Sequence, residues 1–133
     1  ILSYLDLDSK PKKVRKADHG AYTIEGRKSN DPYMSSWSNQ DSYTWFEVAS
    51  PDDPYSALQA YLVLDGHGPH GHLVSAKCAE LLPKHLCDNN FNFRQAFELM
   101  QQDLEDGDLE TCDASLSGST CVAVVLDDEG RVS

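Results

Sequence analysis

The chain has 133 residues, of which 40% are hydrophobic and 25% are charged. This length suits one hydrophobic core rather than two, and the composition is that of a globular protein, not a disordered or fibrous one. The 22 acidic and 11 basic residues give a net charge of −11, which excludes a simple electrostatic nucleic-acid binder and argues against docking on anionic lipid. No apolar run approaches the roughly 20 residues that a membrane span needs.

The N-terminal residues and the cysteines both point to a reducing compartment, the cytoplasm or the nucleus. Residues 1–16 lack the charged-then-apolar pattern of a secretion signal. No two cysteines form a Cys-x-x-Cys pair, which argues against a structural zinc site. We interpret the cysteines as buried free thiols, with disulfides as the alternative; they are Cys78, Cys87, Cys112 and Cys121.

The first third of the chain is polar and interrupted by proline and glycine. Residues 1–19 form a lead-in segment whose basic cluster, residues 10–16, is either solvated or a docking patch for an acidic partner. A weak strand is predicted at Gly20–Glu25. Tyr43–Val48, rich in aromatic and β-branched residues, is predicted to be a stronger strand.

An apolar strand followed by two helices is predicted in the middle of the chain. The strand Ala57–Leu64 is expected to end at a turn, Asp65-Gly66. A helix over residues 72–85 follows, which Pro83 is expected to end or bend. Its apolar stripe comprises Val74, Cys78, Leu81, Leu82 and His85.

The second helix, over residues 93–106, is expected to begin at the cap Asn92 and to end before Gly107. We expect both helices to pack side by side on one sheet. The apolar stripe of the second helix comprises Phe93, Phe97, Met100 and Leu104, of which the last three are expected to be buried.

The C-terminal region predicts a hairpin. Ser119–Leu126 is a strongly apolar strand, Asp127–Gly130 has the composition of a hairpin turn, and Arg131-Val132 begins a return strand. Because the return strand is cut short, the pattern indicates a piece of a larger domain.

Two aspartates are candidate metal ligands. Asp65 lies where a buried strand meets a glycine loop, so its carboxylate is held by rigid backbone but open to solvent, which suits Mg²⁺ or Mn²⁺. Gly66 lets its carbonyl face the same cation. The alternative is an aspartate that merely initiates a tight turn. Asp41, directly before the aromatic strand, is either a ligand at the strand edge or a turn residue.

Three segments, taken in order, resemble the metal-dependent protein phosphatases of the 2C type: Asn39–Asp41, Val63–Gly68 and Leu116–Val124, which contains Ser-Gly-Ser-Thr. The resemblance extends from about Gly20 onward, so residues 20–133 are expected to be the N-terminal part of such a domain. It implies an α+β fold: an antiparallel β-sandwich flanked by helices, of which this chain holds the N-terminal half.

The resemblance also implies an activity, which is Mn²⁺- or Mg²⁺-dependent dephosphorylation of phosphoserine and phosphothreonine in phosphoprotein substrates. Two metal ions would activate the attacking water. Asp65 would bridge both ions, the Gly66 carbonyl would join one, and Asp41 would hold a metal directly or through water. His67 would be the general acid for the leaving oxygen.

This sequence departs from the family pattern near its acidic residues. Residues 33–38 contain no base to grip the phosphate, and the nearest candidates are Arg27 and Lys28. An alternative register would use Asn30-Asp31. Gln40 stands where many members have glutamate. The later metal-binding aspartates are missing, so we expect this chain alone to be inactive, to expose an apolar sheet face and to need the remainder of the phosphatase domain.

Two other functions stay open. The chain could belong to a catalytically inactive, phosphatase-like scaffold or regulatory module. A third interpretation is a transition-metal binder, since a short histidine-rich loop can bind Zn²⁺ or Ni²⁺; its residues would be His67, His70 and His72.

Overall fold

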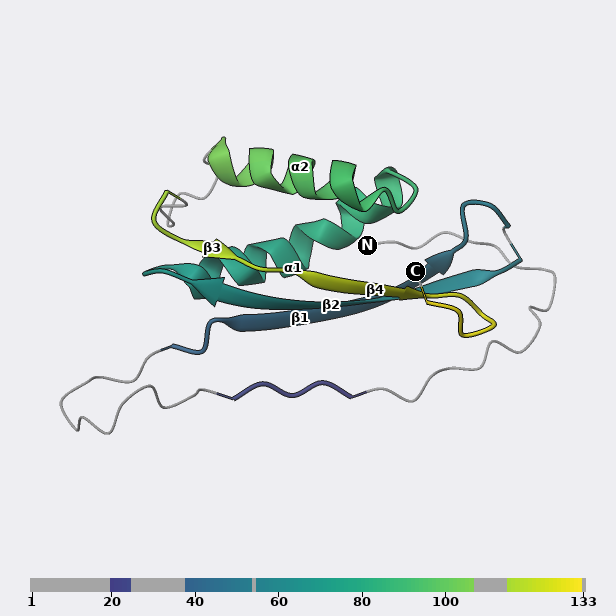
Figure 1. The fold of residues 1–133 in the computed structure, drawn as a ribbon, viewed down its shortest axis with the longest axis horizontal. Coiled ribbons are helices and arrows are strands. Elements are labelled where there is room, and N and C mark those ends of the chain that lie inside the picture. The colour runs from purple at the N-terminus through teal and green to yellow at the C-terminus, as the bar shows by residue number, and fades with distance from the viewer. Residues whose placement is uncertain (1–19, 25–37, 54, 107–114, 133) are drawn as a thin grey trace.

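The computed structural model describes residues 20–24, 38–53, 55–106 and 115–132. In chain order its elements are β1 (Asp41–Ala49), β2 (Ala57–His67), α1 (Gly71–Asp88), α2 (Phe93–Glu105), β3 (Gly118–Ser119) and β4 (Val122–Leu126). The strand β2 is central and pairs antiparallel with β1 on one side and with β3 and β4 on the other. The fold is therefore α+β, with an antiparallel sheet and two helices (Figure 1).

The two faces of this sheet differ in burial. Side chains alternate between faces along a strand, and in β2 Leu62 and Leu64 are buried while Val63 between them is exposed. The buried residues join the core beneath α1. The opposite face, called the open face below, exposes large apolar side chains; they are Tyr43, Trp45, Val63 and Val122. The expectation of an exposed apolar sheet face is confirmed.

The helices form two further layers. The helix α1 lies against the sheet and buries Val74, Leu82 and Leu86, whereas α2 lies on α1, on the side away from the sheet (Figure 1). The expectation that both helices pack on the sheet is wrong for α2. Its buried residues are only Ala96 and Met100, a stripe narrow enough to be covered by one neighbouring helix.

The stripe residues are buried to different degrees. In α1, Val74, Cys78 and Leu82 are buried as predicted, but Leu81 is only half-buried. In α2, Met100 is buried, whereas Phe97 is 37% exposed and its ring lies against that of Phe93. Asn92 caps α2 as predicted, because its side chain accepts a hydrogen bond from the Gln95 N–H.

Three predicted element boundaries are wrong. The helix α1 continues past Pro83 to Asp88, since the burial of the flanking Leu82 and Leu86 offsets the hydrogen bond that proline removes. The strand β2 does not stop at Asp65-Gly66, because Gly66 and His67 pair with β3. The predicted strand Ser119–Leu126 divides into β3 and β4 at Thr120 and Cys121.

The predicted C-terminal hairpin is confirmed. The Gly130 N–H donates to the Asp127 carbonyl, and Val132 forms a bridge with Leu126. The weak strand at the start of the chain is wrong for residues 20–24, which contain no strand; Glu25 lies outside the described residues.

The described thiols are free. Cys78 is buried, and Cys87 and Cys121 are half-buried; Cys112 lies outside the described residues. Of the helices in the described part of the chain, none combines the length and apolar character needed to cross a membrane.

Candidate functional site

Asp41 and Asp65 lie directly opposite each other on β1 and β2. The backbone of Asp65 forms its hydrogen bonds with Thr120, on the side of β2 opposite to β1. Its carbonyl accepts from the Thr120 N–H at 2.9 Å, and its N–H donates to Thr120 Oγ1 at 3.3 Å. The two aspartates therefore form a non-hydrogen-bonded pair, in which Cα atoms are about 4.5 Å apart and side chains are closest. Both are exposed. Their expected proximity is observed, and their role as ligands stays a prediction.

The Gly66 backbone lies beside this pair and is tightly enclosed. Its N–H donates to the Gln40 carbonyl at 3.0 Å, and the hydrogen bonds between described residues include no return bond from the Gln40 N–H to the Gly66 carbonyl. A Cβ at Gly66 would meet the Gly71 carbonyl oxygen and would lie 2.6 Å from the Gln40 oxygen. Only glycine fits in this buried position between β1 and the start of α1.

His67 follows Asp65 by two residues in β2, so it lies on the same face about 7 Å along the strand. Its side chain is exposed, and its cross-strand partner is Gly118. A Cβ at Gly118 would lie 2.7 Å from His67 Nε2, which shows that the imidazole lies against bare backbone. The open face thus carries two carboxylates and an imidazole at one end of the sheet.

The loop between β2 and α1 is held on two sides. On one side, Gln40 Nε2 donates to the Gly68 carbonyl at 2.8 Å. On the other, the His70 N–H donates to Oγ of the buried Ser117 at 2.9 Å. In the sequence, the segment Ser-Gly-Ser-Thr indicated only a resemblance to the family. The structure shows the contacts that its residues make. Ser117 holds the loop, Gly118 makes room for the imidazole, and the Thr120 contacts above hold the Asp65 backbone.

The histidine-rich loop does not gather its histidines into a metal site. Within residues 20–24, 38–53, 55–106 and 115–132, no group of three or more His, Cys, Asp or Glu side chains could hold a metal ion. In the described part of the chain His67, His70 and His72 thus form no such group, and Asp41 and Asp65 are joined by no third such ligand.

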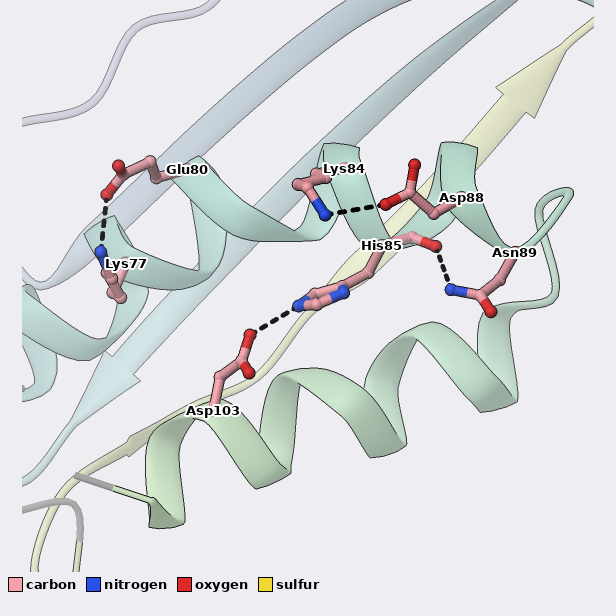
Figure 2. A network of polar contacts seen from close by, with 7 residues as sticks. All are labelled: Lys77, Glu80, Lys84, His85, Asp88, Asn89 and Asp103. Atoms are coloured by element: carbon pink, nitrogen blue, oxygen red, sulfur yellow. Dashed lines mark hydrogen bonds and ion pairs between the residues drawn. The ribbon is translucent and has the colours of Figure 1, made fainter. Parts of the chain in front are cut away.

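Basic side chains lie on other elements. Lys77 pairs with Glu80 at 3.2 Å and Lys84 with Asp88 at 2.8 Å, both along α1 (Figure 2). The Asp88 carboxylate raises the pKa of Lys84 through its hydrogen bond. Arg94 is in α2 and Arg131 is in the C-terminal turn, so no lysine or arginine of the described ranges comes from β1, β3 or the loop between β2 and α1. The candidates Arg27 and Lys28, and the alternative register Asn30-Asp31, lie outside those ranges.

A histidine–carboxylate pair joins the two helices. His85 Nε2 lies 2.7 Å from Asp103 Oδ2, and Asn89 donates to the His85 carbonyl (Figure 2). His85, predicted on the apolar stripe of α1, therefore lies at the edge of the contact with α2.

One comparison with known proteins gives a match. Over 68 residues, or 50% of this chain, the sequence is 35% identical to a protein described as "Probable protein phosphatase 2C 75" from Oryza sativa subsp. japonica. The matched stretch is 13% of that relative, so the chain spans a small part of its length. No family model matches the sequence, and no solved structure matches significantly. The likeness supports a relation to the 2C-type phosphatases, and the α+β fold is compatible with a piece of such a domain.

Proposed function

We propose that residues 20–133 are the N-terminal part of a 2C-type phosphatase domain that removes phosphate from serine and threonine in phosphoproteins. The observation that carries this proposal is the cross-strand pair of Asp41 and Asp65 on the open face, beside the Gly66 carbonyl. The 35% identity to a protein named as a 2C phosphatase supports the same activity.

The residues present fit a hard divalent cation. Like charges directly opposite on neighbouring strands are destabilising, and among the described residues neither Asp41 nor Asp65 has an ion-pair partner. Carboxylate and carbonyl oxygens are the ligands that Mg²⁺ and Mn²⁺ take in proteins. We propose that Asp65, Asp41 and the Gly66 carbonyl would hold the metal ions on this side of the site. Bound ions would supply Lewis acidity and lower the pKa of a bound water.

Other residues of the chain are proposed to supply the general acid and to hold the aspartates in place. We propose that the exposed imidazole of His67 gives a proton to the serine or threonine oxygen as it leaves, which is the role of a general acid. Gly118 leaves room for the ring in its present position, because a Cβ there would lie 2.7 Å from His67 Nε2. Asp41 and Asp65 are rigidly held because their strands pair on the helix-covered sheet.

The raised pKa values of the three described thiols support a hydrolysis in which none of these three cysteines is the nucleophile. Burial raises the pKa of Cys78 to about 11 and also raises the pKa of Cys87 and Cys121. A thiol with a raised pKa is rarely the thiolate that nucleophilic attack requires.

The open face supports a further part of the proposal, that the remainder of the phosphatase domain packs on this chain. Trp45 is 49%, Val63 60% and Val122 65% exposed, on neighbouring strands. Exposed apolar groups gathered in this way mark a surface that another element covers. A second sheet on this face would complete a β-sandwich and bring the remaining metal ligands to Asp41 and Asp65.

Asp65→Asn tests the proposal in the full-length protein. We expect the wild type to hydrolyse a phosphopeptide only with Mn²⁺ or Mg²⁺, and the variant to lose this turnover, because a neutral amide cannot replace a carboxylate that binds the metal. Asp52→Asn is the matched control, since this exposed aspartate lies in the loop between β1 and β2 and should keep the wild-type rate. Wild-type turnover in Asp65→Asn would overturn the assignment.

A specific observation favours an inactive scaffold as the second candidate. In the described ranges no basic residue comes from the elements around Asp41 and Asp65, so nothing there grips the substrate phosphate. The scaffold predicts that the folded full-length protein does not hydrolyse phosphopeptide at any Mn²⁺ or Mg²⁺ concentration. Turnover that depends on Asp65 would exclude it.

A further inference from the structure

Gln40 makes contacts with three separate elements. Its carbonyl accepts from the Gly66 N–H of β2 at 3.0 Å and from Ser75 Oγ of α1 at 2.6 Å. Its side-chain amide donates to the Gly68 carbonyl in the loop at 2.8 Å. Among the hydrogen bonds between described residues, Gln40 alone of β1 and its start is bonded to β2, the loop and α1 together.

The packing around Gln40 is as specific as its hydrogen bonds. A Cβ at Gly71 would lie 2.8 Å from Gln40 Oε1, and a Cβ at Gly66 would lie 2.6 Å from the Gln40 carbonyl oxygen. Two glycines are therefore needed where the loop passes Gln40. The side chain fills the space between the start of β1 and the start of α1.

The bond to Gly68 requires a donor at the end of the side chain. A glutamine amide has two N–H donors, whereas an ionised glutamate has only acceptors. Glutamate at this position would place a carboxylate oxygen against the Gly68 carbonyl oxygen, so the pair would repel. The loop in this chain is thus built for a glutamine.

We propose that Gln40 is a positioning residue that clamps the loop from Gly66 to Gly71 and thereby fixes the Gly66 carbonyl and the His67 ring beside the aspartate pair. The clamp itself needs no metal and no substrate. Its use in metal binding rests on the proposed function.

Local hydrogen exchange in the metal-free, full-length protein tests the clamp. In Gln40→Met, which keeps the length but has no donor, we expect the His70 and Gly71 amides to exchange about fivefold to tenfold faster, as the loss of one hydrogen bond predicts. Gln40→Glu should show the same change. The amides of Leu62 and Leu64 in β2 should exchange as in the wild type, and Gln102→Glu on the exposed surface of α2 is the control for charge.

Two results would overturn the clamp: unchanged exchange at His70 and Gly71, or an equal increase throughout β2 and α1, which would indicate general destabilisation. If Gln40→Met does not fold, Gln40→Asn decides, because its amide is one methylene too short to reach the Gly68 carbonyl and should produce the same local increase.

Titration with Mn²⁺ separates the clamp from the proposed function. If both hold, Gln40→Met should bind Mn²⁺ about tenfold more weakly than the wild type, a typical effect of removing a residue that orients a ligand. Mn²⁺ affinity equal to that of the wild type would show that the clamp does not serve the site. A wild type that binds no Mn²⁺ would contradict the proposed function and leave the exchange result to decide the clamp alone.

Discussion

The two faces of one sheet have opposite characters in this protein. On the face under α1, Ala60 and Leu62 are 1% exposed and Leu64 is fully buried, whereas Val63 and Trp45 on the open face are 60% and 49% exposed. The same strands carry both sets, because successive side chains of a strand point to opposite faces. The packing that stabilises the fold is therefore complete on one face, and the groups available for chemistry and for a partner lie on the other.

The contrast is sharpest at the end of the sheet near the loop between β2 and α1. On the covered side, Ser75 is fully buried, and its hydroxyl bonds both the Gln40 carbonyl and Ser42 Oγ. On the open side, Asp41 and Asp65 face solvent. Exposed functional groups need rigid support to keep their geometry, and the bonded, closely packed covered side supplies it.

Trp45→Ala in the full-length protein gives the largest effect expected from this comparison. If a second sheet covers the open face, the truncation should reduce the free energy of unfolding by about 3–5 kcal/mol, as for a buried tryptophan. Tyr55→Ala is the control, because Tyr55 lies outside the sheet and is 78% exposed, so its loss should cost little. Urea unfolding measures both. Equal, small costs would mean that the open face is solvent-exposed in the whole protein.

On the side of the sheet that α1 covers, the helix residue Leu82 is part of the core. Leu82→Ala should reduce the free energy of unfolding by about 2–5 kcal/mol, because burial is lost and a cavity is left. Leu82 is 2% exposed, whereas its neighbour Leu81 is half-buried. Leu81→Ala should therefore cost clearly less, although both leucines belong to the predicted stripe. Thermal or urea unfolding of the two variants checks the phase of α1, and the reverse order would contradict the observed packing.

Two glycines near the site extend the comparison. Alanine at Gly66, on the covered side, would press its Cβ against backbone atoms of Gly71 and Gln40, so Gly66→Ala should cost about 1–3 kcal/mol or more. Alanine at Gly118 would meet only the imidazole of His67, which can turn away. Gly118→Ala should thus unfold at nearly the wild-type urea concentration but shift the NMR signals of the His67 ring. A larger stability loss at Gly118 than at Gly66 would refute this distinction.

Local patterns in the sequence predicted the elements and part of the site. The aromatic and β-branched run at 43–48 lies within β1, and the apolar run at 57–64 lies within β2. Both patterns depend only on neighbouring residues, as does the cap at Asn92. The proximity of Asp41 and Asp65 came instead from the family resemblance, because pairing between strands is not encoded in either strand alone.

The features that the sequence did not predict depend on contacts between distant segments. The strand β2 extends to His67 because Gly118 and Ser119, some 50 residues later, pair with it. The outer position of α2 depends on which surface of α1 the sheet leaves uncovered. The role of Gln40 was also missed, since a glutamine before a strand carries no signal until the loop that it contacts is in place.

The smallest expected effect concerns the thiol of Cys78, a buried residue of α1 on the side of the sheet that this helix covers. Burial, with a lesser contribution from the nearby Cys121, raises the pKa of Cys78 from 9.0 to about 11. In the unfolded chain the thiol ionises near its ordinary pKa, so between about pH 9 and pH 11 the unfolded state has lost a proton that the folded state keeps. Its contribution to stability is therefore complete well below pH 9 and is lost as the pH rises toward 11.

Cys78→Val tests this pH dependence, because valine has no proton to lose. The free energy of unfolding of this variant should fall less steeply in this window, measured by urea unfolding at intervals from pH 8 to pH 10.5. The slopes of wild type and variant should converge toward pH 8, where the thiol is almost fully protonated in both states, and equal slopes throughout would contradict the burial of Cys78.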